Sequence, residues 1–248
     1  MPKDLFSDQS QVYAKYRPTY PVELFEYIIS FVEKRECAWD CATGNGQAAS
    51  ELSNYFTRVD ASDISESQLS QAIQKPNIHY HLCAAEETSY ANDSFDLITI
   101  ATAYHWLNPG RFKTEATRVA RQNAVIAAWG YSFIQSDEIA LNELVHHFYY
   151  DIVYSYWDRG RRHMENSYKT VEFEYEPLPE KEFRIDVHWT KEQFTGFFQS
   201  WSAVQTFTKE NNASPLPLIK DDLEQAWGIE ESRHFHFPIF LRLGRVVK

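Results

Sequence analysis

Apolar runs alternate with helix-like stretches through the first half of the chain, and this alternation constrains the fold most strongly. The apolar runs cover 37–42, 58–64, 78–84, 95–101 and 124–129, and the helix-like stretches cover 22–34, 47–56, 65–75 and 109–121. The run at 95–101 is almost unbroken, which is typical of a strand covered on both faces. The order strand–helix–strand–helix–strand–strand–helix–strand predicts a doubly wound, mostly parallel α/β sheet.

The second half is less regular and rich in aromatic residues. We expect a long amphipathic helix over 137–157, an alternating strand at 171–176, a strand at 183–189, a helix at 191–204 and a final strand at 234–247. We interpret 1–248 as one domain with a core at 1–131. The segment 132–180 is expected to be an insertion that caps the substrate, and 181–248 is expected to complete the sheet.

Charge and cysteine content limit the partners of the protein. A formal net charge of −11 disfavours nucleic acid, and only the basic cluster Arg159, Arg161, Arg162 and His163 runs against that average. The three cysteines are typical of reduced thiols in a cytoplasmic protein. The segment MPKDLFSDQS lacks an apolar signal core, and no run approaches 18 apolar residues, so we expect neither export nor a membrane span.

Polar and glycine residues follow the predicted strands at the points where they end. Asp40 begins the stretch DCATGNG after the first strand, Asp63 ends the second, and Ala85 and Glu86 follow the third. In doubly wound sheets ligands bind beyond these carboxyl ends. Glycines at 44 and 46 allow a tight turn and a close backbone approach, and the next helix offers free N–H groups to an anion.

DCATGNG, ASDIS, CAAEE and DSFDLITIATAYHW together resemble, in order and spacing, the successive motifs of class I S-adenosylmethionine (SAM)-dependent methyltransferases. The resemblance covers about residues 10–131. YAKYRPTYP (13–21) and AYHWL (103–107) are similar, more narrowly, to the trans-aconitate-methyltransferase-like members. The resemblance implies a seven-stranded Rossmann-like fold, SAM as cofactor and methyl transfer to a small-molecule acceptor.

The resemblance also implies roles for individual residues. It suggests Asp40, Ala42, Gly44 and Gly46 for the methionine end of the cofactor, Asp63 for the ribose, Ile64 beside the adenine and Ala85–Glu86 at its edge. Arg17 and Thr102 are further cofactor-binding candidates, with a surface ion pair as the alternative for Arg17. The family often has glycine where Ala42 stands and an acidic residue where Ala84 stands, so adenine recognition here relies on Glu86 or on backbone groups.

The acceptor is expected near the end of the fourth strand. Tyr104, His105 and Trp106 are the candidate pocket residues, and His105 is the candidate catalytic residue because it could orient or deprotonate an acceptor. The alternative for His105 is a hydrogen bond to backbone, and for Trp106 plain packing. Aromatic residues at 148–157 are either core or pocket lining.

The histidine pairs 79/81, 146/147 and 234/236 lack a nearby third ligand in sequence, and only distant segments could complete a site, so no metal is expected.

Other functions stay open on sequence alone. Gly44–Ala49 also satisfies G-x-G-x-x-A, with Asp63 near the position of a ribose-binding acid, which would suit an NAD-dependent oxidoreductase. That alternative leaves Asp40 and the His105–Trp106 pair unexplained. A methyltransferase acting on protein or RNA and a SAM-binding protein without catalysis are the remaining alternatives. For a small-molecule methyltransferase, a carboxylate is the expected acceptor and an O-methyl ester the product, but this expectation rests only on the resemblance to the family.

Overall fold

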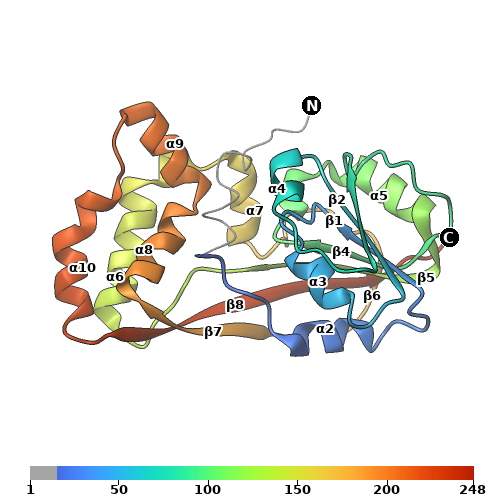
Figure 1. Cartoon of the computed structure of the whole chain (residues 1–248), viewed down its shortest axis with the longest axis horizontal. Coiled ribbons are helices and arrows are strands. Elements are labelled where there is room, and N and C mark those ends of the chain that lie inside the picture. Colours follow the sequence, from blue (N-terminus) through green and yellow to red (C-terminus); the bar gives the residue numbers. More distant parts are fainter. Residues whose placement is uncertain (1–15) are drawn as a thin grey trace.

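The computed structural model describes residues 16–248. The amino-terminal segment and Tyr13–Lys15 of the YAKYRPTYP motif therefore lie outside the described residues. Figure 1 shows an α/β sheet with helices on both faces at one end of the molecule and a group of helices at the other. Within 16–248, no helix has the length and apolar character needed to cross a membrane.

The predicted doubly wound sheet is confirmed. Its strands are β1 (Cys37–Cys41), β2 (Arg58–Asp63), β3 (Ile78–Leu82), β4 (Phe95–Ala101), β5 (Ala120–Tyr131), β6 (Glu176–Pro177), β7 (Phe183–Thr190) and β8 (Ser232–Arg245). The order is β3-β2-β1-β4-β5-β8, with β1 to β5 parallel and β8 antiparallel to β5. The switch in strand order falls between β1 and β4, where a ligand is expected. Both β6 and β7 pair with β8, and the two-residue β6 adds to the seven strands expected.

Helices cover both faces of this sheet. The α-helices of the sheet half are α2 (Val22–Ile29), α3 (Gln47–Leu52), α4 (Glu66–Ser70) and α5 (Pro109–Val119). Side chains of α2 and α3 pack in one buried apolar cluster, and those of α5 pack in a second cluster on the opposite face of β1 and β4. The first cluster continues into the distant helices, so a single apolar interior links the two ends of the molecule.

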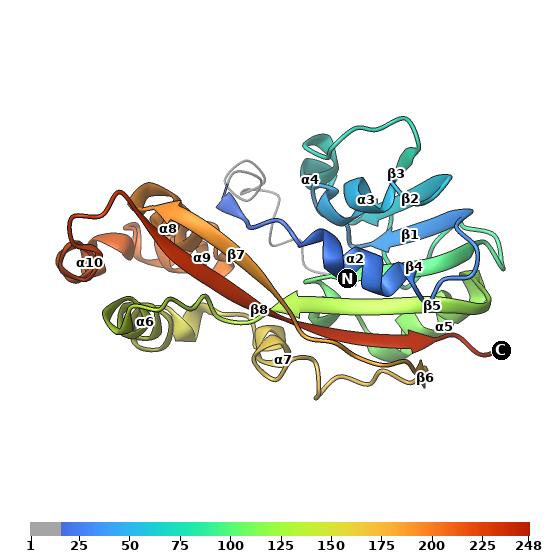
Figure 2. The same cartoon turned by 90° about the horizontal axis from the view of Figure 1, so that it is seen from below.

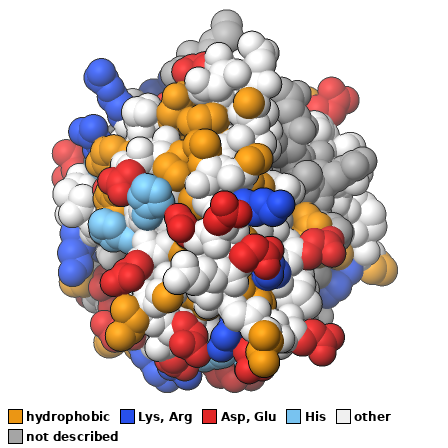
Figure 3. All heavy atoms as spheres, turned by 90° about the vertical axis from the view of Figure 1, so that its left-hand side faces the viewer, with side chains coloured by type: hydrophobic (Ala, Val, Ile, Leu, Met, Phe, Trp, Pro, Cys, Tyr) orange, Lys and Arg blue, Asp and Glu red, His pale blue; other side chains and the backbone are white. Residues whose placement is uncertain are grey.

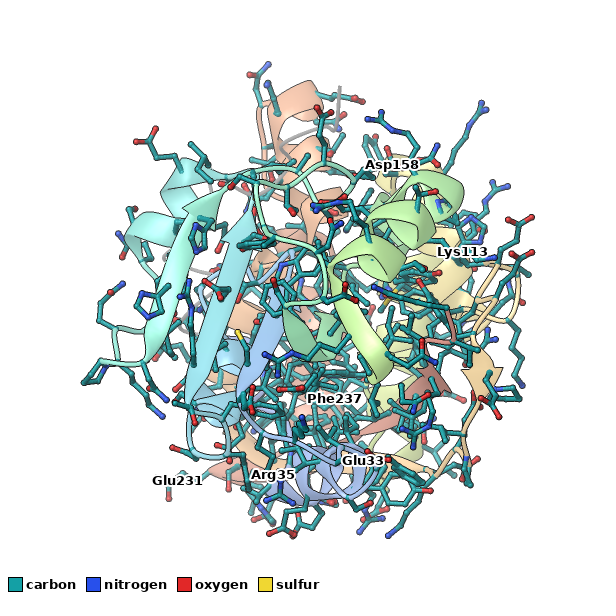
Figure 4. The ribbon with its side chains drawn as sticks, turned by 90° about the vertical axis from the view of Figure 1, so that its right-hand side faces the viewer. Glu33, Arg35, Lys113, Asp158, Glu231 and Phe237 are labelled. Carbon is teal, nitrogen blue, oxygen red and sulfur yellow. The ribbon has the colours of Figure 1, made fainter. Side chains whose placement is uncertain are left out.

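A long antiparallel ribbon joins the sheet to the second group of helices. The carboxyl-terminal half of β8 pairs with β5, whereas its amino-terminal half extends beyond the sheet and pairs with β7 (Figure 2). The helices packed around this extension, which we call the helical lobe, are α6 (Ile139–His146), α8 (Lys191–Gln199), α9 (Ser202–Asn211) and α10 (Lys220–Trp227). Phe237 of β8 is fully buried at this junction and lies in the interior in Figure 4.

Two helices and one strand of the carboxyl-terminal half differ from those expected. The helix predicted over 137–157 ends at His146 and continues as a wider π-helical turn, His147–Ile152, which lets the consecutive rings of Phe148 and Tyr149 both be buried. The predicted helix 191–204 is two helices that meet near Ser200.

The strand predicted at 171–176 pairs only at Glu176. Glu172 and Glu174 are nevertheless exposed while Phe173 and Tyr175 pack inward, as the alternation predicts. Lys113 on the outer side of α5 forms an ion pair with Glu174 and so fixes this segment without strand pairing (Figure 4).

Candidate active site

A buried carboxylate organises the glycine turn after β1. Asp40 is fully buried at the end of the strand, where one oxygen accepts hydrogen bonds from the Thr43 hydroxyl and the Ala49 N–H and the other accepts from the Thr99 hydroxyl at 2.8 Å. Burial raises the pKa of this carboxyl to about 6, although the three hydrogen bonds favour its charged form. Asp40 therefore fixes the turn and the start of α3 from below and does not line the cavity above them.

A second carboxylate lies at the mouth of the same turn. Asp63 ends β2, and its two oxygens accept the N–H of Gly44 at 2.8 Å and the N–H of Ser65 at 2.9 Å. The Ser65 hydroxyl in turn accepts the N–H of Gln68 and caps the start of α4. The carboxyl ends of β1 and β2 are thus held together at one edge of the sheet.

The backbone of this edge is left-handed at several positions. Gly44 and Gly46 have φ of 57° and 80°, and Ala42, where the family often has glycine, has φ of 54°. Thr102, which follows β4, has φ of 55°, and its side chain is hydrogen-bonded to the Tyr20 hydroxyl at 2.7 Å. Such conformations cost a β-branched residue about 1–3 kcal/mol and concentrate at functional sites.

These strand ends surround an open cavity of about 1120 Å³, here called the first cavity. Of the predicted cofactor-binding residues, the ones that line it are Ala42, Gly44, Asp63, Ile64, Ala85, Glu86 and Thr102. Glu86 also accepts the N–H of Asn108 at 2.8 Å, which fixes its carboxylate beside the start of α5. The cavity thus offers a carboxylate, bare backbone and small apolar walls, which suits an adenosyl group with an amino-acid tail.

A second cavity adjoins the first, and Thr102 and Trp106 line both. Its other walls come from the end of β5 and the residues after it, from the segment 157–164 and from the helical lobe, and are mostly aromatic: Tyr131, Phe133, Trp157, Phe197 and Trp201. Arg17, His105 and Arg161 also line it, and within the described range 16–248 none of its lining residues is acidic. In a chain with a net charge of −11, this cavity is locally positive.

Besides Asp40, two predicted cofactor-binding residues, Arg17 and Gly46, do not line the first cavity, and one predicted pocket residue, Tyr104, lines neither the first nor the second. Arg17 lines the second cavity, where its guanidinium donates to the Tyr131 hydroxyl at 2.6 Å and to the Ser200 carbonyl at 3.0 Å. Tyr104 is fully buried, donates to the Glu172 carbonyl at 2.6 Å and lines neither cavity. Gly46 lies below the first cavity, at the start of α3.

His105 lines the second cavity as a neutral ring. Its Nδ1 is hydrogen-bonded to the Tyr168 hydroxyl at 3.0 Å. Burial lowers the pKa of His105 well below its usual value, and the nearby charges of Arg161 and His163 lower it further. At neutral pH His105 is therefore a weak base, fitted to orient an acceptor by hydrogen bonding rather than to take its proton.

Arg161 is the main residue of these cavities to which the sequence assigned no site role. It belongs to the cluster of basic residues at 159–163 in a chain whose net charge is negative. In the structure the side chains of this cluster lie in different surroundings. The Arg161 guanidinium lies over the Trp157 ring, 5.0 Å from its centroid, and reaches the second cavity, whereas Arg162 is exposed. The only signal in the sequence was the run of basic residues itself.

Comparison with known proteins agrees with this geometry. Residues 39–128 match the family model described as a methyltransferase domain. A Dictyostelium discoideum protein with a methyltransferase name is 32% identical over 249 residues, covering 98% of this chain and 95% of that protein. The chain belongs to the class I SAM-dependent methyltransferases.

Further relatives support the same family. A structure from Anaeromyxobacter dehalogenans described as a type II methyltransferase is 34% identical, covers 94% of this chain and 99% of that chain, and superposes with a TM-score of 0.85. A Saccharomyces cerevisiae protein named as a SAM-dependent methyltransferase is 28% identical over 161 residues, 60% of this chain and 55% of the yeast protein. The protein is a methyltransferase with SAM as its cofactor, and the nicotinamide alternative is set aside.

Gly46→Ala is expected to destabilise this methyltransferase by about 2–3 kcal/mol, because alanine disfavours the left-handed conformation and its Cβ would lie 2.3 Å from the Tyr80 hydroxyl oxygen. Denaturant unfolding of purified protein measures the loss. In a Tyr80→Phe background the loss should shrink by at least about 1 kcal/mol, since the clashing atom is gone. An equal loss in both backgrounds would contradict the steric cause.

Proposed function

We propose that this methyltransferase methylates a carboxylate oxygen of a small organic acid bound in the second cavity. The observation that carries the proposal is that two guanidinium groups, Arg17 and Arg161, and no acidic side chain of residues 16–248 line a cavity that shares a wall with the first cavity. Arginine pairs well with carboxylates, and aromatic walls favour the carbon skeleton of such an acid. The likeness of YRPTYP and AYHWL to the trans-aconitate-methyltransferase-like members supports the same acceptor class.

In this proposal the protein contributes binding, orientation and exclusion of water. SAM supplies an electrophilic methyl group on a sulfonium. Asp63 would accept hydrogen bonds from the ribose hydroxyls of SAM, Gly44 would leave room for its amino-acid tail, and Ile64 and Ala85 would flank its adenine. Thr102 and Trp106, common to both cavities, bring the acceptor into line with the donor. A carboxylate is ionised at neutral pH and needs no general base, which fits the low pKa of His105.

The direct experiment is a screen of metabolites with isotope-labelled SAM. We expect label in carboxylic acids, released as methanol by mild alkali because the product is a methyl ester. Label that survives alkali, in amines or phenols only, would overturn the carboxylate proposal while leaving the methyltransferase assignment intact.

Arg161→Met is expected to raise KM for the acid about 10- to 100-fold while kcat changes little, because one charge-assisted hydrogen bond contributes roughly 1.5–3 kcal/mol of binding. Methionine keeps an apolar side chain near Trp157. The exposed Arg162→Met is the matched control and should leave KM unchanged. Equal KM values in the two variants would argue against an anion-binding role for Arg161.

A protein or RNA acceptor is less favoured. The second cavity has a mostly aromatic lining with two arginines, which suits a small molecule, and the face in Figure 3 carries interspersed acidic and basic side chains rather than one basic surface. We further propose that 1–248 acts as one unit, with 132–180 and the helices of the lobe as the substrate cap. The free thiols of Cys37, Cys41 and Cys83 are consistent with a cytoplasmic location.

A further inference from the structure

Two histidines and an aspartate converge on the part of the β7–β8 ribbon that lies beyond the sheet. His234 and His236 lie two residues apart on β8, and Asp137 precedes α6. One ligand atom from each of the three lies within 4.8 Å of the others, and His234 Nδ1 is 3.5 Å from Asp137 Oδ2. Ligands about 2.0–2.2 Å from a tetrahedral Zn²⁺ lie about 3.4 Å apart, so this pair already has the spacing of two zinc ligands.

The outer nitrogen of each histidine is occupied. His234 Nε2 is 2.9 Å from Asp186 Oδ1, and His236 Nε2 is 3.0 Å from Gln135 Oε1. Both partners are acceptor oxygens, so in the neutral tautomer that satisfies them each histidine donates from Nε2 and keeps a lone pair on Nδ1. Among the described residues, the buried His236 Nδ1 has no hydrogen-bond partner. A histidine held by a carboxylate or amide oxygen on one nitrogen, with a lone pair on the other, is typical of metal ligands.

The loop that carries Asp137 is fixed on both sides. Ser136 exchanges hydrogen bonds with the Asn142 side chain, 2.8 and 2.7 Å, and its hydroxyl donates to the His234 carbonyl at 3.2 Å. Glu138, which follows Asp137, forms an ion pair with Arg233 at 3.0 Å. Asp137 itself is 83% exposed, so its carboxylate can turn toward an ion without disturbing the core.

We propose that Asp137, His234 and His236 form a binding site for a divalent transition-metal cation of the Zn²⁺ class. Two imidazoles and one carboxylate match the ligand preference of zinc, with water as the fourth ligand. The nearby arginines are neutralised, since Arg184 pairs with Asp186 and Arg233 with Glu138. The ion ties the loop before α6 to β8, so it fastens the helical lobe to the ribbon. The sequence alone offered only the pair 234/236, because Asp137 is almost 100 residues away.

The test is a Zn²⁺ titration of untagged, chelator-treated full-length protein against a chromophoric zinc indicator. We expect one equivalent bound with Kd below about 10 µM, and a melting temperature that rises with zinc concentration. Asp137→Asn and His236→Gln should each weaken binding at least about tenfold, and Asp186→Ala, which removes the hydrogen-bond partner of His234 Nε2, about tenfold as well.

The matched control is Asp151→Asn. Asp151 pairs with His147 Nδ1 at 2.8 Å on the surface, and no third ligand completes a site there among the described residues. Its substitution should leave zinc affinity unchanged. Failure to bind Zn²⁺ at 100 µM, or binding that Asp137→Asn leaves unchanged, would overturn the proposal. Asp137 is exposed, so this variant decides the matter even if His236→Gln does not fold. Methyl transfer plays no part in the readout.

Discussion

Asp63→Ala is expected to weaken binding of S-adenosylhomocysteine about 100-fold, measured by isothermal titration calorimetry. In our proposal each ribose hydroxyl donates a hydrogen bond to this carboxylate, and a charge-assisted hydrogen bond contributes roughly 1.5–3 kcal/mol. The same oxygens accept the N–H groups of Gly44 and Ser65, so the variant also loosens the turn that faces the cofactor. A 100-fold loss corresponds to about 2.7 kcal/mol.

Asp63→Asn removes the negative charge at this position but keeps the size of the side chain, so it shows how much of the cofactor affinity depends on the charge. The amide keeps one acceptor oxygen but loses the charge, so we expect a loss of roughly tenfold, between the wild type and alanine. Asp63 lines the open first cavity, where water can accept hydrogen bonds from the N–H groups of Gly44 and Ser65, so the melting temperature of both variants should fall by only a few degrees. Wild-type affinity in a folded Asp63→Ala protein would remove Asp63 from the cofactor site.

Asp40→Ala is expected to destabilise the protein by about 3–5 kcal/mol in denaturant unfolding. The substitution leaves three donors, on Thr43, Ala49 and Thr99, without their acceptor in a fully buried place, and each buried unsatisfied group costs roughly 1–3 kcal/mol. For a chain of this length the melting temperature should fall by roughly 10 °C. SAM binding should fall with it, because the glycine turn loses its anchor. A loss below 1 kcal/mol would show that the turn holds without Asp40.

The pH dependence of stability tests whether the Asp40 carboxyl is buried as described. Its pKa is raised from 3.8 to about 6, so the folded state holds this proton more tightly than the unfolded state does. The resulting stabilisation is complete below about pH 4 and is lost as pH rises through 6, an effect of roughly 3 kcal/mol. The unfolding free energy of the wild type relative to Asp40→Asn should therefore fall between pH 4 and pH 6 and stay level above pH 7. A difference that does not change with pH would contradict the raised pKa.

The two aspartates illustrate how far the sequence reaches into the site. Asp40 and Asp63 were both assigned to the cofactor because both end parallel strands, and ends of neighbouring parallel strands meet at one edge. That reasoning brings both to the right edge. It does not distinguish a carboxylate that faces the cavity from one that faces the core, because the direction of a side chain at a strand end depends on the turn that follows.

Arg17 and Arg161 show that sequence patterns do not reveal which distant residues share a cavity. Arg17 was assigned to the cofactor from its motif, yet its guanidinium is held by Tyr131 and Ser200 in the second cavity. Arg161 shares that cavity although 144 residues separate the two in sequence. No local spacing connects them, since one precedes the first strand and the other follows the fifth.

The sequence by itself determined the doubly wound sheet, the glycine turn and the family, because strand and helix periodicity and the turn requirements of glycine are local properties of the chain. Only the tertiary structure decided the second cavity and the Asp137–His234–His236 cluster. Each brings together segments far apart in the sequence, and contacts between such segments depend on packing, which no local pattern encodes.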